Sequence, residues 1–292
     1  MKKRIGRTVL TVLAAAFALL FLLPTVLTIT NSFMTQSELN ANYGQVFTNM
    51  TDNKGKTYIA DEVNLKFIPD KVSFSQYITA LFKSPDYLLK FWNSMILVVP
   101  IVLLQVAVAA VAAYGFTRWR GKIRSFLFFF YVILMLMPYQ VTLVPNYLVS
   151  SWLHLIDTRW AIIFPGAFAP FSVFLLTKFM RRIPVSLIEA AKLDGSSEWQ
   201  IFTQICLPQC RSALYSIAIL VFIDYWNMVE QPLIYLKDVG SYPLSVFLAS
   251  RYTENLPLQF VCCVLSLLPL ALCFFYCGGD VLDSGIPKEE KA

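Results

Sequence analysis

Six long stretches of this chain carry almost no charge, and this feature constrains the fold more than any other. Only Asp224 is charged within them, and they cover residues 9–29, 91–117, 125–153, 160–177, 212–228 and 255–279. A helix needs about 20 mostly apolar residues to cross the hydrocarbon core of a bilayer. Charged residues make up 14% of the chain, whereas a soluble domain averages about 25%. The sequence therefore predicts an all-α polytopic membrane protein with six transmembrane helices, and it excludes an ordinary cytosolic enzyme.

The basic residues predict the orientation of the chain in the membrane. They gather before the first stretch, between the second and third, and after the fourth: Lys2, Lys3, Arg4, Arg7, Arg118, Arg120, Lys122, Arg124, Arg181 and Arg182. Basic loops stay on the cytoplasmic side, so both termini are expected to be cytoplasmic. Residues 33–88, 154–159 and 230–254 are then extracytoplasmic. The net charge of +6 follows from these loops, and we predict contact with membrane lipid and no nucleic-acid partner.

This orientation divides the chain into four segments. An N-terminal transmembrane helix over residues 1–30 precedes an extracytoplasmic loop over residues 31–88. A core over residues 89–280 holds five transmembrane helices and a connecting loop at 184–208, and a cytoplasmic tail covers residues 281–292. A signal peptide is the alternative for the first helix, but its apolar run exceeds the usual ~7–15 residues and no small-residue cleavage site follows. We therefore expect this helix to be retained.

Few residues could support catalysis or bind a metal. Gly55-Lys56-Thr57 resembles the end of a phosphate-binding loop, but Met50 stands where the pattern requires glycine. His154 is the only histidine, and most of the six cysteines lie in apolar runs: Cys206, Cys210, Cys262, Cys263, Cys273 and Cys277. They complete no four-ligand zinc set, and cysteine packs well as a small apolar residue. We predict that the chain is not an enzyme and holds neither a metal nor a cofactor.

The most informative segment is the polar link between the fourth and fifth stretches. It reads RRIPVSLIEAAKLDGSSEWQIFTQICLPQCR from Arg181 to Arg211. Ser186 and Glu189 have the spacing of a capping box, which predicts a helix from near Leu187. Asp194-Gly195 ends this helix, because glycine suits the left-handed position just after a helix.

A second short helix is expected directly after this turn. Ser197 and Gln200 repeat the capping-box spacing, and an apolar residue recurs every third position at Trp199, Phe202 and Ile205. The link is therefore predicted to be a bent pair of amphipathic helices. Its polar side mixes both charges, at Glu189, Lys192, Asp194 and Glu198. A helix that lies on anionic lipid is rich in Lys and Arg, so a protein partner fits this surface better.

The same link resembles a known signature. Glu189-Ala190-Ala191, then Gly195 after three residues and Ile205-x-Leu207-Pro208 after nine more, resembles the EAA motif of ABC importer permeases. The flanking sequence is similar to the carbohydrate branch of that family, the maltose-type (MalG-like) inner-membrane subunits, at Met137-Pro138, Gln140–Pro145, Trp226-Asn227 and Pro232-Leu233. The resemblance covers about residues 67–277.

The resemblance implies a type I ABC importer permease fold and a function. Such a subunit forms a heterodimer with a second permease. Two copies of a cytoplasmic ATPase, which hold ATP and Mg, drive the import of a sugar or oligosaccharide that an extracytoplasmic solute-binding protein delivers. The complex lies in the prokaryotic inner or plasma membrane. By motif position the ATPase contacts are Glu189, Ala190, Ala191 and Gly195, to which the adjacent Asp194 is added.

Three features depart from the family pattern. Gln209-Cys210-Arg211 stands where a further proline is common, residues 281–292 lack the usual glycine-rich basic ending, and the loop at 40–66 is longer than in typical members. Three other functions remain alternatives: an importer permease for a non-sugar solute, a polytopic membrane enzyme, and a secondary transporter that needs no ATPase. The last of these leaves the 184–208 loop unexplained.

Asp224 is the strongest candidate for a contact with the solute. A charge near the bilayer centre costs about 2.5–3.5 kcal/mol on insertion scales, so Asp224 is expected to face a cavity or a partner. Tyr225, Trp226 and Asn227 stand beside it, and carboxylates and aromatic rings bind sugars well. A structural hydrogen bond to the partner subunit is the alternative. Helix–helix hydrogen bonding explains equally well three weaker candidates, Gln105, Tyr139 and Asn146.

Overall fold

The computed structural model describes residues 2–51, 65–83, 85–119, 121–250 and 256–285. Every regular element within these ranges is a helix, which confirms the predicted all-α class. The chain divides into two compact units, Met1–Leu89 with Phe247–Leu268, and Lys90–Val246 with Pro269–Ala292.

The first unit contains more helix than the sequence suggested. Its elements are α1 (Lys2–Asn31), α2 (Gln36–Thr51), α3 (Ser75–Ile78), η1 (Thr79–Lys83) and the first part of α15 (Leu256–Gly285). Met34, Leu39 and Tyr43 are buried, with Phe260 of α15 packed against them. Asn31 donates a hydrogen bond to the Tyr43 hydroxyl at 3.0 Å. Part of the predicted 31–88 loop is therefore a helix with its own small core.

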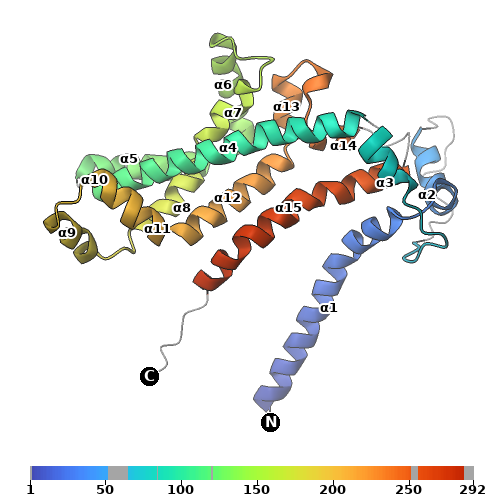
Figure 1. The fold of residues 1–292 in the computed structure, drawn as a ribbon, viewed down its shortest axis with the longest axis horizontal. Helices are drawn as coiled ribbons and strands as arrows, with labels where there is room; N and C mark the ends of the chain where they lie inside the picture. Colours follow the sequence, from blue (N-terminus) through green and yellow to red (C-terminus); the bar gives the residue numbers. More distant parts are fainter. Residues whose placement is uncertain (1, 52–64, 84, 120, 251–255, 286–292) are drawn as a thin grey trace. The chain divides into compact units, whose positions relative to one another are not determined.

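The second unit is a helix bundle (Figure 1). Its elements are α4 (Pro85–Arg118) from Lys90 on, α5 (Lys122–Met135), α6 (Tyr139–Trp152), α7 (Trp160–Ala167), α8 (Pro170–Met180), α9 (Val185–Leu193), α10 (Glu198–Gln200), η2 (Ile201–Cys206), α11 (Leu207–Gln209), α12 (Arg211–Trp226), α13 (Glu230–Tyr235), η3 (Val239–Ser241), the start of α14 (Leu244–Ser250) and the second part of α15. Its core joins α4, α7, α8 and α12 through fully buried aliphatic side chains: Leu97, Ile101, Ile162, Leu176 and Ile217.

Four helices are long and apolar enough to cross a membrane by themselves. They are Thr8–Asn31, Asp86–Arg118, Trp160–Met180 and Pro257–Tyr276. Two further segments pass the same test only as bent pairs, α5 with α6 at 104° and Glu198–Gln209 with α12 at 73°, so the number of spans reaches six when each pair counts as one. In the second pair α12 is the apolar part, because Glu198 and the rest of α10 precede it in the polar link.

The third predicted span is broken rather than continuous. Residues 125–153 form two helices separated by Leu136, Met137 and Pro138, and Pro138 has an extended backbone with ψ of 144°. A residue that precedes proline is disfavoured in the α region, so α5 ends before Met137 and α6 starts after Pro138. By contrast Pro24, Pro100 and Pro269 remain inside α1, α4 and α15, as transmembrane helices tolerate.

Several predictions concern segments at or beyond the edge of the described residues. α15 continues to Gly285, so the first residues of the predicted 281–292 tail are helical. The remainder of that tail, residues 286–292, lies outside the described residues, as do Gly55-Lys56-Thr57 and residues 52–64 of the long loop.

The segment between α13 and α14 is tied to α4 by side chains of α4. Lys90 donates to the carbonyl groups of Val239 and Gly240, and Asn93 donates to the Gly240 carbonyl at 2.7 Å. The Ser94 hydroxyl accepts a hydrogen bond from the Leu244 amide at 2.8 Å. Because these polar groups of α4 are largely buried and paired, they hold the segment between α13 and α14 against α4.

Candidate functional site

The first half of the 184–208 loop is α9, and it starts earlier than predicted. Pro184 is the N-terminal cap, Val185 is the first helical residue, and no side chain caps the helix. The predicted capping box between Ser186 and Glu189 is therefore wrong. Pro184 explains the difference, because its fixed φ suits the approach to a helix and places Ser186 inside the first turn rather than before it.

The end of α9 is a complete Schellman motif, which confirms the predicted glycine turn. Gly195 has a φ of 84°, and its amide donates to the Lys192 carbonyl at 3.1 Å. The Ser196 amide donates to the Ala191 carbonyl at 3.0 Å. This pair of bonds is the characteristic pattern of a helix that ends in a left-handed residue. The chain therefore reverses sharply after Asp194.

The second half of the loop starts with the predicted capping box. The Gln200 amide donates to the Ser197 hydroxyl at 3.3 Å, and the Ser197 amide donates to the Gln200 side chain at 2.8 Å. The predicted apolar face is confirmed only in part. Phe202 is buried and Ile205 is half-buried, but Trp199 is 68% exposed, and Ile201, which lies outside the pattern, is fully buried. The helix widens to π-helix at η2, where residues five apart, such as Ile201 and Cys206, share a face.

The folded loop has a packed side and an exposed side. Ile188, Ile201 and Cys206 are buried together, and they hold α9 against η2. Of the five residues that resemble the ATPase contacts, Ala191 is half-buried and the other four are exposed: Glu189, Ala190, Asp194 and Gly195. Leu193, between them, is 89% exposed. A slim helix edged by carboxylates and one apolar side chain is thus available to another surface.

Glu198 is the most strongly paired group of this loop. Its carboxylate accepts a hydrogen bond from the Tyr114 hydroxyl at 2.5 Å, and the Lys192 ammonium lies 2.5 Å from it. Arg118 adds a longer ion pair at 3.5 Å. Hydrogen bonds from Lys192 and Tyr114 lower the pKa of Glu198 to about 2, because they favour the charged form of the carboxyl.

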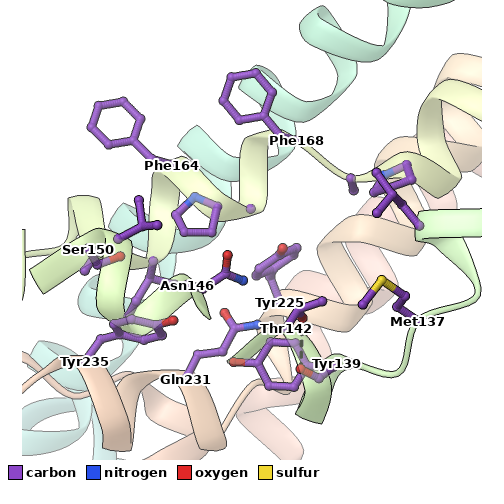
Figure 2. Close-up of a pocket in the computed structure, with 18 of the residues that line it drawn as sticks. Met137, Tyr139, Thr142, Asn146, Ser150, Phe164, Phe168, Tyr225, Gln231 and Tyr235 are labelled. Atoms are coloured by element: carbon purple, nitrogen blue, oxygen red, sulfur yellow. Dashed lines mark hydrogen bonds between the residues drawn. The ribbon is translucent and has the colours of Figure 1, made fainter. Parts of the chain in front are cut away.

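A second candidate site is a cavity of about 1030 Å³ in the bundle (Figure 2). The end of α5, one face of α6, the α7–α8 junction, the end of α12 and α13 surround it. Its polar lining consists of Tyr139, Thr142, Asn146, Ser150, Asp224, Tyr225, Gln231 and Tyr235. Its largest apolar side chains are Phe164, Phe168 and Phe171. The volume lies at the upper end of the range for small-molecule sites, roughly 300–1,000 Å³.

The structure brings two of the four predicted pathway residues into this cavity. Asp224 and Tyr225 line it, whereas Trp226 and Asn227 lie elsewhere. Trp226 is 4% exposed and stacks on Phe222, with ring centroids 5.4 Å apart. Asn227 donates to the Ile223 carbonyl at 2.8 Å and so occupies the end of α12. Successive residues of a helix point about 100° apart, so four consecutive residues cannot share one cavity.

Gly166 allows Tyr225 to reach the cavity. A Cβ atom at Gly166 would lie 3.0 Å from the Tyr225 hydroxyl oxygen and 3.0 Å from the Ile101 side chain. A side chain at this position would force Tyr225 or Ile101 to shift by a few tenths of an ångström. Glycine therefore favours this close approach between α7 and α12 through packing, without any unusual backbone conformation.

Two of the three weaker candidates, Tyr139 and Asn146, line the cavity. Thr142 was not predicted, although it lies three and four residues from them and so on the same face of α6. Gln231 and Tyr235 are likewise four apart on α13. By contrast Gln105, another weak candidate, is buried away from the cavity and donates to the Ser172 hydroxyl at 2.7 Å. Gln105 therefore serves helix–helix packing.

The charges of the cavity are few. Asp224 is its one acid, and Lys, Arg and His do not occur among the described residues that line it. In the described part of the chain, no group of three or more His, Cys, Asp or Glu could hold a metal ion. The lining thus offers hydroxyl, amide and carboxylate groups with aromatic faces, which suit hydrogen bonding and stacking rather than bond-making chemistry.

A multi-span helical bundle with an exposed helical loop and a polar cavity is the architecture of a transport permease. The chain belongs to the family described as binding-protein-dependent transport system inner membrane component, whose model matches residues 105–278. This result confirms the resemblance found in the sequence.

The relatives and a solved structure agree with this family. The lactose transport system permease protein LacG of Rhizobium radiobacter is 30% identical over 72% of this chain and 80% of its own length. The arabinooligosaccharides permease AraQ of Bacillus subtilis is 29% identical over 73% of this chain and 77% of its own. A bacterial ABC transporter that imports the acidic polysaccharide alginate superposes with a TM-score of 0.77 at 22% identity, over 96% of this chain and 97% of that one. This likeness confirms the predicted ABC importer permease fold.

Proposed function

We propose that this chain is the permease subunit of an ATP-driven importer that carries a sugar or an oligosaccharide across the inner membrane. Family membership makes it a transport component, and two of its relatives are named for lactose and arabino-oligosaccharides. The observation that carries the proposal is the polar cavity at Asp224 and Tyr225. Its hydroxyl, amide and carboxylate groups match the hydroxyls of a sugar, and its aromatic rings match the C–H faces.

We propose further that the exposed side of α9 binds a cytoplasmic ATPase. Glu189, Ala190, Ala191, Asp194 and Gly195 would form this contact. The exposure of four of these residues and the rigid Schellman turn support it. ATP and Mg belong to two copies of that ATPase, and a second permease subunit and an extracytoplasmic solute-binding protein complete the assembly. The basic loops favour a cytoplasmic position for both termini.

The cavity also favours a neutral sugar. A uronic sugar carries a carboxylate on each ring, and a buried carboxylate without a cationic partner loses its hydration without compensation. The described lining offers Asp224 and no cation, so repulsion between Asp224 and the sugar carboxylate further disfavours a uronic sugar. The proposed solute class is therefore a neutral sugar or short oligosaccharide.

A mild-detergent pull-down of the tagged chain with mass spectrometry tests the assembly. We expect an ATPase and a second permease to accompany the wild-type chain, and the ATPase alone to be lost when Glu189 and Gly195 are both replaced. A matched control replaces Glu230, an exposed acid on α13 far along the chain from the loop, with glutamine. Recovery of a solitary chain under conditions that preserve known importers would contradict this assembly and favour the secondary transporter.

A further inference from the structure

We propose that Glu198 is a positioning residue through which α9 moves α4. The inference rests on the proposed function, because it concerns how a displacement of α9 by an ATPase reaches the membrane-spanning bundle. It assigns a role to one carboxylate and to the Tyr114 hydroxyl, neither of which belongs to the proposed ATPase contact.

Three elements meet at this one carboxylate. Lys192 lies in the last turn of α9, Glu198 is the first residue of α10, and Tyr114 and Arg118 lie one turn apart at the end of α4. Glu198 bridges α9 and α4, because Lys192 and Arg118 both pair with its Oε1 atom while Tyr114 donates to Oε2. Tyr114 and Glu198 are 84 residues apart in sequence, so the bridge joins α4 to α10, which the chain connects only through α5 to α9 and their links.

The bridge is attached to a rigid turn. The Schellman bonds after Asp194 and the capping box at Ser197 hold α9 and α10 in one relative orientation. A displacement of α9 therefore moves Glu198 with it. Charge-assisted hydrogen bonds have narrow geometry, so the Tyr114 end of α4 is expected to follow Glu198 rather than slide past it.

Apolar packing also joins the loop to α4, but it has a different consequence. The Tyr114 ring packs against the Ile188, Ile201 and Cys206 cluster, and its centroid lies 5.0 Å from that of Phe202. Such contacts are non-directional, so they hold the elements together without fixing their register. The contribution of the Tyr114 hydroxyl can thus be separated from that of its ring, because Tyr114→Phe removes only the hydroxyl.

The exposure of Glu198 makes this separation practicable. Its side chain is 54% exposed, and exposed ion pairs add little to folding stability. Removing one of its hydrogen bonds should therefore leave the fold and the assembly intact. The loss of the hydrogen bond should affect only the coupling between the ATPase and the helix bundle.

The test uses the complete importer reconstituted in lipid vesicles. Three quantities are measured: the amount of ATPase that co-purifies, the ATP hydrolysis rate without binding protein, and the factor by which purified binding protein raises that rate. Tyr114→Phe and Glu198→Gln are the test variants. Tyr131→Phe is the matched control, because it removes a hydroxyl from α5, outside the Glu198 network.

We expect both variants to keep the wild-type ATPase content and basal hydrolysis, and to lose about fivefold or more of the stimulation, the lower end of measured allosteric couplings. The double variant should lose little more than Glu198→Gln alone, because the Tyr114 hydroxyl acts through the same carboxylate. Glu198→Asp keeps the charge and should recover part of the response. Tyr131→Phe should respond like the wild type.

Two results would overturn the inference. Full stimulation in Tyr114→Phe and Glu198→Gln would show that the hydroxyl and carboxylate transmit nothing. A proportional loss of ATPase content, basal rate and stimulation would show that Glu198 only supports the structure. Failure of the proposed function looks different, since the wild-type complex itself would then contain no ATPase or ignore the binding protein.

Discussion

Two glycines of this chain matter for different physical reasons. Gly166 has an ordinary backbone, but a Cβ atom there would press on the Tyr225 side chain at 3.0 Å. Gly195 has open space around the position of a Cβ atom, but its φ is 84°, a conformation that costs a residue with a side chain roughly 1–2 kcal/mol. Replacing Gly166 therefore alters the cavity, whereas replacing Gly195 alters the path of the loop.

Replacing Gly195 tests whether conformation or bulk matters at the end of α9. We expect Gly195→Ala to reduce sugar uptake strongly and Gly195→Asn to reduce it less, because asparagine adopts the left-handed conformation more readily than alanine. Uptake into cells and ATPase co-purification are the measurements. If asparagine, the larger side chain, is the more harmful substitution, the surface contact at Gly195 matters more than the backbone. Unchanged uptake in both variants would refute a coupling role for this turn.

At the scale of the elements, Glu198 of the 184–208 loop is held in its ionised form. Its pKa is lowered from 4.5 to about 2, so the bonded carboxylate stabilises the loop fully above about pH 4.5. This contribution is lost as the pH falls through the folded-state value near 2. Glu198 is therefore no switch in the physiological range.

The prediction concerns the difference in melting temperature between the wild-type complex and Glu198→Gln. We expect this difference to stay constant from pH 5 to pH 8, because Glu198 is charged throughout in both the folded and unfolded states. Thermal unfolding of the detergent-purified complexes at several pH values measures it. If the difference in melting temperature instead changes between pH 5 and pH 8, Glu198 gains or loses its proton in that range. Lys192 and Tyr114 would then not hold its carboxyl in the charged form.

The elements show how far the sequence could predict the fold. The apolar stretches predicted the long helices, and Gly195 and Ser197 predicted the turn and the second cap, because these signals are local. Proline was ambiguous: Pro100 stays inside α4, whereas α5 ends before Pro138. The outcome depends on whether neighbouring helices satisfy the freed carbonyl groups. The π-helix at η2 could not be predicted either, since the pattern of Trp199, Phe202 and Ile205 fits an ordinary α-helix.

At the scale of the whole molecule, the cavity shows what sequence reasoning lacked. Asp224 could be predicted from its isolated charge in an apolar stretch, but its surroundings come from α6, the α7–α8 junction and α13. These segments are distant in sequence, and only packing brings them together. The position of Trp226 close to Asp224 in the sequence suggested a contact with the solute, but Trp226 belongs to the core beside Phe91 and Phe222.

The last prediction concerns the solute that the whole importer carries. We expect the reconstituted complex to import a neutral trisaccharide and to reject a uronic trisaccharide, with binding-protein affinity for each measured separately. Asp224→Asn should weaken uptake of the neutral sugar by roughly tenfold or more, because a hydrogen bond to a charged group is worth about 1.5–3 kcal/mol. Glu230→Gln removes a carboxylate outside the cavity and should leave uptake unchanged. If Asp224→Asn instead dissociates the complex, Asp224 pairs with the partner permease, and the neutral-sugar assignment loses its main residue.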